Sequence, residues 1–340
     1  MTLTAAPSHD LRKPSDYAAL MADVQQAGLL QRSAAHYGPR MATLAALVVA
    51  GIMGLLRLGD SWWQLATATY FGVLFAQLGF LGHDAGHQQI FRAKQRNDRF
   101  GLVVATLGVG LSYGWWVDKH NRHHRNPNEV GRDPDVERNV LAWTASQASR
   151  QRGLLRVIAR HQHVAFFPLL LLEGWNLHVG SVRALAQRSG HRVLESSLLF
   201  VHVAGSLTLL FTVLPPLKAV AFIVVQQSVL GLYLGSAFAP NHKGMEMPAG
   251  GGRSDFLRRQ VLTSRDITGG RLTAAVFGGL NYQIEHHLFP SMPSRNLRRC
   301  SPIVREFCRA RNITYTETNV FASYRWALRY LRSVQPDPTL

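Results

Sequence analysis

The sequence predicts an all-α integral membrane protein with four transmembrane helices in two hairpins and a helical cap on the cytoplasmic side. Three observations predict this fold class. Four long apolar stretches are almost free of charge, short breaks join them in pairs, and nearly all basic residues lie outside these breaks. The 340 residues include 37 Lys and Arg against 20 Asp and Glu, a formal net charge of +17, although 47% of the chain is hydrophobic.

The apolar stretches are long enough to cross a bilayer, whose core takes about 20 apolar residues and about 17 at the short end. The predicted spans are residues 41–56, 62–82, 194–214 and 217–239. The first span is marginal in length, and Pro215-Pro216 separates the last two. Because the breaks are too short to hold a domain, each pair predicts a helical hairpin. Trp62 and Trp63 stand where an interfacial aromatic belt would lie.

Two shorter apolar stretches, residues 100–117 and 164–180, are expected to be helices at the membrane interface or partly within it. The first is rich in glycine, and the second contains Glu173, Asn176 and His178. If residues 100–117 crossed the membrane alone, the Arg-rich chain that follows would lie outside. That orientation would contradict the positive-inside rule.

The charge distribution orients the four spans. The external breaks hold Arg57, Asp60 and Lys218, which sum to +1, so the remaining +16 faces the cytoplasm, as in other membrane proteins. Both termini are therefore expected in the cytoplasm. The expected organisation is a cytoplasmic N-terminal segment at residues 1–40, a membrane domain at 41–300 and a cytoplasmic C-terminal segment at 301–340.

Composition excludes several classes of protein. The two cysteines, Cys300 and Cys308, form no CxxC pair, which excludes a disulfide-stapled secreted domain and a cysteine-ligated metal site. Clustered arginines are typical of a face against anionic lipid, and without a nucleic-acid-binding signature no nucleic-acid partner is expected. Of the 37 basic residues 32 are Arg, which indicates a GC-rich bacterial genome and hence the bacterial cytoplasmic membrane.

Histidines cluster at the cytoplasmic ends of the predicted spans. HDAGH follows the second span, HNRHH follows the first short apolar stretch, QIEHH follows the fourth span, and Asn241-His242 stands at the end of that span. Residues three and four apart share one face of a helix, so each cluster predicts aligned side chains. The candidate metal ligands are His83, His87, His120, His123, His124, His242, His286 and His287.

Eight imidazoles suffice for two metal sites, because a tetrahedral zinc takes four ligands and a catalytic one takes three from the protein. Imidazole binds Fe, Cu, Zn and Ni alike, so the ligand type leaves the metal open. Histidines that only hydrogen-bond at the interface are the alternative, but three clusters on one side favour a histidine-rich dimetal site in the cap. Nearby carboxylates are expected to accept hydrogen bonds from metal-bound imidazoles. The candidates are first Asp84 and Glu285, and then Asp118, Asp133 and Asp135.

The three clusters resemble the histidine boxes of the membrane fatty acid desaturase family in sequence, order and placement around two hairpins. The resemblance covers roughly residues 40–300 and makes 41–300 a desaturase domain. It implies two iron ions held by the box histidines, with His242 as the additional ligand, and O2 as co-substrate. It also implies an oxidoreductase that inserts a cis double bond into a long-chain acyl-CoA or acyl-lipid. Catalysis would rest on the metal ligands, with no separate acid or base.

The third box has Gln283 where many family members have His. This form resembles the front-end, linoleoyl-CoA group, and it also occurs in bacterial acyl desaturases of other regiospecificity, so the double-bond position stays open. Gln283 is a further candidate ligand, through its carbonyl oxygen or through a water. The chain lacks the HPGG motif of a fused cytochrome b5 domain. Electrons are therefore expected from a separate ferredoxin- or cytochrome b5-like carrier with its reductase.

An acyl substrate requires an apolar tunnel. The candidate lining residues are Trp115, Trp116, Phe166, Phe167 and Trp175, at which ordinary packing is the alternative. Glu173 and His202 are ionisable groups in apolar surroundings, either functional or locally paired in the interior. Histidines without the box spacing are expected to be ordinary residues, and these are His161, His163, His178 and His191.

Two other functions stay open. A hydroxylase or ketolase of the same scaffold would act on fatty acids, sphingolipids or carotenoids, and would differ in box spacing and product. A non-catalytic metal transporter or sensor would need polar ligands midway through the spans. The QIEHH box favours the desaturase over these oxygenases, and histidines that gather at one boundary count against transport.

Overall fold

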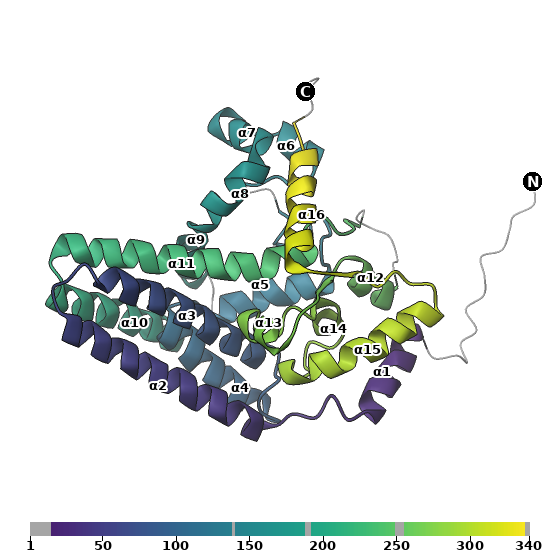
Figure 1. The fold of residues 1–340 in the computed structure, drawn as a ribbon, viewed down its shortest axis with the longest axis horizontal. Helices are drawn as coiled ribbons and strands as arrows, with labels where there is room; N and C mark the ends of the chain where they lie inside the picture. Colours follow the sequence, from purple (N-terminus) through teal and green to yellow (C-terminus); the bar gives the residue numbers. More distant parts are fainter. Residues whose placement is uncertain (1–14, 138–139, 188–191, 249–254, 337–340) are drawn as a thin grey trace, which may run out of the picture.

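The computed structural model is mostly helical (Figure 1) and describes residues 15–137, 140–187, 192–248 and 255–336. Four long helices form two hairpins: α2 (Ala34–Leu58) with α3 (Gln64–Gly86), and α10 (Arg192–Val213) with α11 (Pro216–His242). All four have the length and hydropathy of a membrane span, which confirms the predicted number and pairing.

The helices continue beyond the apolar runs that predicted them. α2 begins at Ala34 and not at residue 41, and α11 ends at His242 and not at residue 239. Hydropathy marks the part of a helix that suits the bilayer, whereas backbone hydrogen bonding carries the helix further. The last turn of α11 therefore presents Asn241 and His242 at the end that bears the other histidines.

The turns of the two hairpins meet at one end of the bundle, on the left in Figure 1. Lys218 Nζ donates a hydrogen bond to Asp60 Oδ1 at 2.6 Å and so joins the two turns. Within the first turn, Gln64 Nε2 donates to the carbonyl oxygens of Leu55 and Gly59 at 2.8 and 3.0 Å. The histidine-bearing ends of α3 and α11 consequently lie together at the opposite end.

α3 and α11 form the centre of the bundle. A Cβ atom on Gly72 of α3 would lie 2.6 Å from Cβ of Val229 on α11, so glycine allows the two helices to approach closely. On α11, a Cβ atom on Gly231 would lie 2.4 Å from the backbone nitrogen of Gly174, which belongs to α9 (Glu173–Gln187). Glycines thus allow α11 to lie close against both α3 and α9.

Residues 100–117 are mostly helical, as expected, but they do not form one continuous helix. α4 (Lys94–Gly101) continues into a π-helix, η1 (Leu102–Val109), and α5 (Tyr113–Arg125) then leaves at an angle of 110°. Gly110 makes the break possible, because it adopts a left-handed conformation with φ of +83°. The start of α5 is fixed by Ser112, whose hydroxyl accepts from the Trp115 backbone N–H and donates to Glu195 of α10.

The helix expected over residues 164–180 is likewise two helices, α8 (Gln162–Leu170) and α9, separated by Leu171 and Leu172. The close contact of Gly174 with α11 requires the chain to turn at this point. Two short helices, α6 (Ala145–Ser149) and α7 (Gly153–Arg160), precede them and project away from the bundle (Figure 1).

The remaining elements form the cap at the histidine end. They are α1 (Asp16–Gln26), α12 (Phe256–Leu262), β1 (Asp266–Ile267), α13 (Arg271–Val276), α14 (Gln283–Leu288), α15 (Ser294–Ala310), β2 (Glu317–Thr318) and α16 (Val320–Ser333). A second apolar core joins α1, α12, α14 and α15. The parallel pairing of β1 with β2 places Asp266 beside α14, where its carboxylate accepts from the Ile284 backbone N–H at 3.0 Å and caps that short helix.

Candidate metal centre and its cavity

Four helices bring the eight candidate histidines together. They are His83 and His87 at the end of α3, His120, His123 and His124 on α5, His242 at the end of α11, and His286 and His287 on α14. None of the eight side chains exposes more than 9% of its surface. Residues more than 200 positions apart in the chain thus form one buried cluster, and neighbouring rings such as His83 and His286 have centroids 4.7 Å apart.

The cluster divides into two groups with the number of ligands that a metal ion requires. His83, His87, His120 and His286 each place one ring nitrogen within 4.8 Å of the others, and His123, His242 and His287 do the same. His124 lies between the groups, with ring centroids 4.6 Å from His87 and 4.2 Å from His287. Four and three imidazoles are typical of tetrahedral metal sites.

Several ring nitrogens are buried without a hydrogen-bond partner among the described residues. They are His83 Nε2, His87 Nε2, His124 Nδ1, His287 Nε2 and both nitrogens of His286. Buried polar atoms are nearly always satisfied, so this concentration of unsatisfied nitrogens requires an explanation. Bound metal ions would satisfy them, and the donor set therefore fits a metal pair.

Five of the imidazoles are held in the neutral form that binds metal. Burial, together with neighbouring imidazoles, holds the pKa of His87, His120, His124, His286 and His287 well below its ordinary value. A protonated imidazole cannot act as a ligand. The site is therefore ready for metal at neutral pH.

Hydrogen bonds to the protein orient the rings of the second group. Nδ1 of His123 lies 2.9 Å from Asp133 Oδ2, and Nδ1 of His242 lies 3.0 Å from the Thr263 carbonyl oxygen. Nδ1 of His287 lies 3.0 Å from Gln260 Oε1. In each ring Nδ1 is committed to the protein, which leaves Nε2 for a ligand.

The candidate carboxylates have different surroundings. Asp133 accepts from the backbone N–H groups of Asn128 and Asp135, at 2.7 and 2.9 Å, and is fixed against His123. Asp84 Oδ1 lies 3.4 Å from His83 Nδ1, and its other oxygen accepts from Ser294. By contrast, Asp118 forms an exposed pair with Arg122.

Glu285 faces away from the imidazoles. Its Oε1 atom lies 3.0 Å from the hydroxyl of Tyr315, which also lies 2.6 Å from Asp266. Burial raises the pKa of Asp266 to about 6 and raises that of Glu285 well above its ordinary value. The two carboxyl groups thus meet at the Tyr315 hydroxyl behind α14 and join this helix to β1.

Gln283 lies beside the second group. Its Nε2 atom is 2.9 Å from Nε2 of His242, and its Oε1 atom accepts from Asn241 Nδ2 at 3.3 Å. The amide thus contacts the nitrogen that His242 would offer to a metal.

Sequence motifs did not indicate Gln260 or Thr263. Gln260 contacts His287 and also donates to the His124 carbonyl oxygen at 3.0 Å, so one amide connects α12 to two boxes. Neither residue belongs to a motif, and only a three-dimensional structure or an alignment of relatives would identify them.

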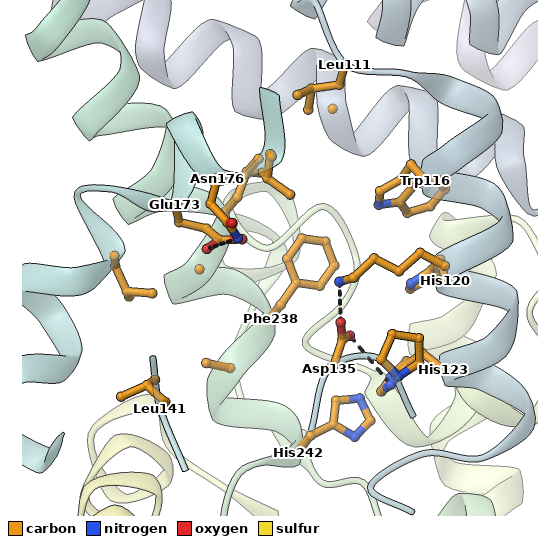
Figure 2. Close-up of a pocket in the computed structure, with 18 of the residues that line it drawn as sticks. Leu111, Trp116, His120, His123, Asp135, Leu141, Glu173, Asn176, Phe238 and His242 are labelled. Atoms are coloured by element: carbon orange, nitrogen blue, oxygen red, sulfur yellow. Dashed lines mark hydrogen bonds and ion pairs between the residues drawn. The ribbon is translucent and has the colours of Figure 1, made fainter. Parts of the chain in front are cut away.

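An apolar cavity of about 450 Å³ adjoins the histidines (Figure 2). Its wall includes His83 and His120, and it extends past Phe238 to Leu111 and Gly79. Of the five predicted tunnel aromatics, Trp116 and Phe166 line the cavity, whereas Trp115, Phe167 and Trp175 are absent from its described wall.

The two ionisable candidates differ in their relation to the cavity. Glu173 lines it, whereas Nδ1 of His202 lies 2.8 Å from the Leu107 carbonyl oxygen of the π-helix. His178 makes a similar local contact, with the Gly174 carbonyl oxygen. His161 and His163 belong to neither group of imidazoles in the described part of the chain, and His191 lies outside the described residues.

Comparison with known proteins agrees with this arrangement. The family model "Fatty acid desaturase" matches residues 60–319. The chain belongs to the fatty acid desaturase family. The match covers α3, the whole second hairpin, all three histidine clusters and most of the cap. The membrane-type helices and the histidine cluster are consistent with a family of membrane oxidoreductases of lipid metabolism.

The sequence identity to individual desaturases is moderate. The chain is 29% identical over 341 residues to the acyl-lipid (9-3)-desaturase of Physcomitrium patens, over 96% of this chain and 64% of that protein. It is 30% identical over 290 residues to a Delta(6)-fatty-acid desaturase of Caenorhabditis elegans, over 80% of this chain and 65% of that protein. A Delta(8)-fatty-acid desaturase of Helianthus annuus is 27% identical over 340 residues, with 94% and 72% covered. The chain thus spans slightly less than two thirds of the first two relatives.

Proposed function

We propose that this chain is a membrane-bound acyl desaturase that inserts a cis double bond into a long-chain acyl-CoA or acyl-lipid. The observation that carries the proposal is the junction of two groups of buried imidazoles with an apolar cavity. A polymethylene chain suits such a cavity, because it offers apolar surface and few hydrogen-bonding groups. The similar proteins, which are named as acyl-lipid, Delta(6) and Delta(8) desaturases, support the substrate class.

The box histidines and His242 would hold two iron ions, with Gln283 beside the second. Side-chain acids and bases cannot attack an unactivated methylene, so a bound iron pair would supply the oxidising power together with O2. Overall, two electrons and two protons from outside and two hydrogens from the substrate would convert O2 into two waters. The electrons would come from a separate ferredoxin- or cytochrome b5-like carrier.

The protein's own side chains would hold, orient and shield the reacting groups. Asp133 and Gln260 fix their imidazoles through Nδ1, and Asp84 does the same more loosely for His83. Glu285 would act indirectly, since it braces α14 through Tyr315. Trp116 stacks on His120 with ring centroids 4.5 Å apart, which keeps water from the methylenes beside the imidazoles.

The basic residues support a cytoplasmic site. With the hairpin turns outside, the histidine end and most of the +17 net charge face the cytoplasm. The Arg-rich composition indicates that the cell is a bacterium. Such a face would attract anionic lipid head groups and would steer an acidic electron carrier toward the cap.

Mass spectrometry of fatty acids from a bacterial host that expresses the chain tests the proposal. We expect a new unsaturated fatty acid, located by dimethyl disulfide adducts, that is absent with His286→Ala and present with His161→Ala, a variant outside the cluster. Hydroxylated or ketonic products would instead identify the oxygenase of the same scaffold. A purified chain that binds well under two irons and cannot be reloaded would contradict the diiron centre.

A further inference from the structure

The cavity has a polar end that the metal centre does not use. Four polar side chains, Lys119, Asp135, Glu173 and Asn176, line it, and we call them the polar cluster. Lys243 and Glu137 also line the cavity, and Lys243 Nζ donates to the Asp135 carbonyl oxygen at 3.2 Å. Figure 2 shows Asp135 beside the ring of His123, with Glu173 and Asn176 across the cavity. Charged groups on the wall of an apolar cavity are costly to bury and so indicate a function.

The polar cluster lies next to the second group of imidazoles. Lys119 Nζ donates a hydrogen bond to the Asp135 carboxylate, whose other oxygen lies 3.6 Å from His123 Nδ1. A single carboxylate therefore separates the ammonium group from the metal centre. Across the cavity, Asn176 Nδ2 donates to Glu173 Oε2 at 3.1 Å.

The charges of the polar cluster select the ligand. Its one ammonium group faces two carboxylates, and the charges of Lys243 and Glu137, which also line the cavity, offset each other. A free fatty acid anion would therefore meet net negative charge. A neutral carbonyl oxygen carries no charge and is not repelled. The ammonium group has three N–H donors, and its bond to Asp135 uses one of them. The chemistry therefore suits the carbonyl group of an ester or thioester.

We infer that Lys119 binds the carbonyl oxygen of the acyl ester or thioester and so sets the position of the double bond. This inference rests on the proposed function and deepens it. With the carbonyl group held one carboxylate away from His123, methylenes near the carbonyl end lie against the imidazoles. The rest of the chain extends past Phe238 toward Leu111. The double bond is thus counted from the carbonyl end.

Binding of two probes to the purified chain in detergent tests the contact without turnover. The probes are octadecanoyl-pantetheine, a thioester, and octadecyl-pantetheine, the thioether that lacks the carbonyl group. We expect the unchanged chain to bind the thioester on the order of tenfold more tightly, which corresponds to about 1.4 kcal/mol. The double variant Lys119→Met with Asp135→Asn should bind both probes equally.

The double variant is needed because Lys119→Met alone would leave the Asp135 charge without its partner. Lys119→Arg keeps a donor and should keep the preference, and Lys218→Met, at the hairpin turns, is the matched control. Equal binding of the two probes by the unchanged chain, or an undiminished preference in the double variant, overturns the inference.

Product analysis provides the second readout. In the expression host, the double variant should spread the double bond over neighbouring positions, while Lys119→Arg and Lys218→Met form one isomer. A single unshifted isomer from the double variant also overturns the inference. Failure of the proposed function gives a different result. In that case the chain would form no double bond but would still bind the thioester more tightly than the thioether.

Discussion

The two helices of each hairpin differ in burial and in hydropathy. In the first hairpin the apolar window of α3 is 56% buried and that of α2 only 17%; in the second, α11 is 39% buried and α10 only 11%. The buried helices are the less apolar ones, with mean hydropathies of 1.4 and 1.6 against 2.0 and 1.8. They also carry His83 and His242 of the cluster, and His87 directly follows α3. The comparison teaches that the more apolar helix of each pair faces the lipid. The more polar helix is buried and carries the residues of the site.

The largest expected effect on activity comes from replacing a histidine of the first hairpin by alanine. His83→Ala on α3 should lower product formation by at least about 100-fold, since losing even a group that supports a metal ligand costs 10- to 100-fold. His36→Ala, at an exposed position on α2, should change neither product nor iron content. Fatty acid analysis and iron determination on both purified variants check this. Equal losses in the two variants would contradict the division between inner and outer helices.

Added methyl groups test the second hairpin. Gly231→Ala on α11 would place a methyl group 2.4 Å from the Gly174 backbone nitrogen, and such overpacking costs about 1–3 kcal/mol. Gly205→Ala on α10 meets no atom within 4 Å and gains up to about 1 kcal/mol of helix propensity. Thermal unfolding in detergent should therefore show a lower midpoint for the first variant and an unchanged or higher one for the second. A shift of the same sign in both would show that α10 also packs tightly.

A larger side chain on the inner helix α3, compared with one on the outer helix α2, tests which helix limits the length of the acyl chain. Gly79 of α3 lines the cavity, and a Cβ atom there would come no closer than 3.8 Å to its nearest neighbour, on Leu234. Gly79→Leu should therefore fold and shorten the cavity, which shifts products several-fold toward shorter acyl chains. Gly54→Leu, on the open face of α2, is the control and should leave the chain-length profile unchanged. An unaltered profile for Gly79→Leu would mean that the acyl chain does not reach this residue.

The smallest effect is expected at the opposite end of the bundle, where the hairpin turns meet. Asp60 is more than half exposed, and exposed ion pairs contribute about 0–1 kcal/mol. Asp60→Asn should therefore shift the unfolding midpoint slightly at low salt and not at all at high salt, where the pair is screened. A large shift that persists in salt would indicate that this pair fastens the two hairpins together.

Local patterns predicted the parts of the fold that depend on neighbours in sequence. The spans follow from apolar runs, and the alignment of His83 with His87 follows from helix periodicity. The bend before α5 does not, because it depends on a left-handed Gly110 and on the contact between Ser112 and Glu195, which are 83 residues apart. The break between α8 and α9 likewise reflects packing of Gly174 on another helix.

By itself the sequence determined four membrane helices in two hairpins and a set of histidines near one end of them. Hydropathy and helical spacing are properties of a segment and its solvent, so they can be read without knowing what the segment packs against. Only the tertiary structure decided how the imidazoles divide into two groups and which residues orient them, such as Gln260 on His287. It also placed Lys119 and Asp135 on the cavity wall beside His123. These contacts join helices far apart in the chain, and no local pattern specifies which distant side chains will meet.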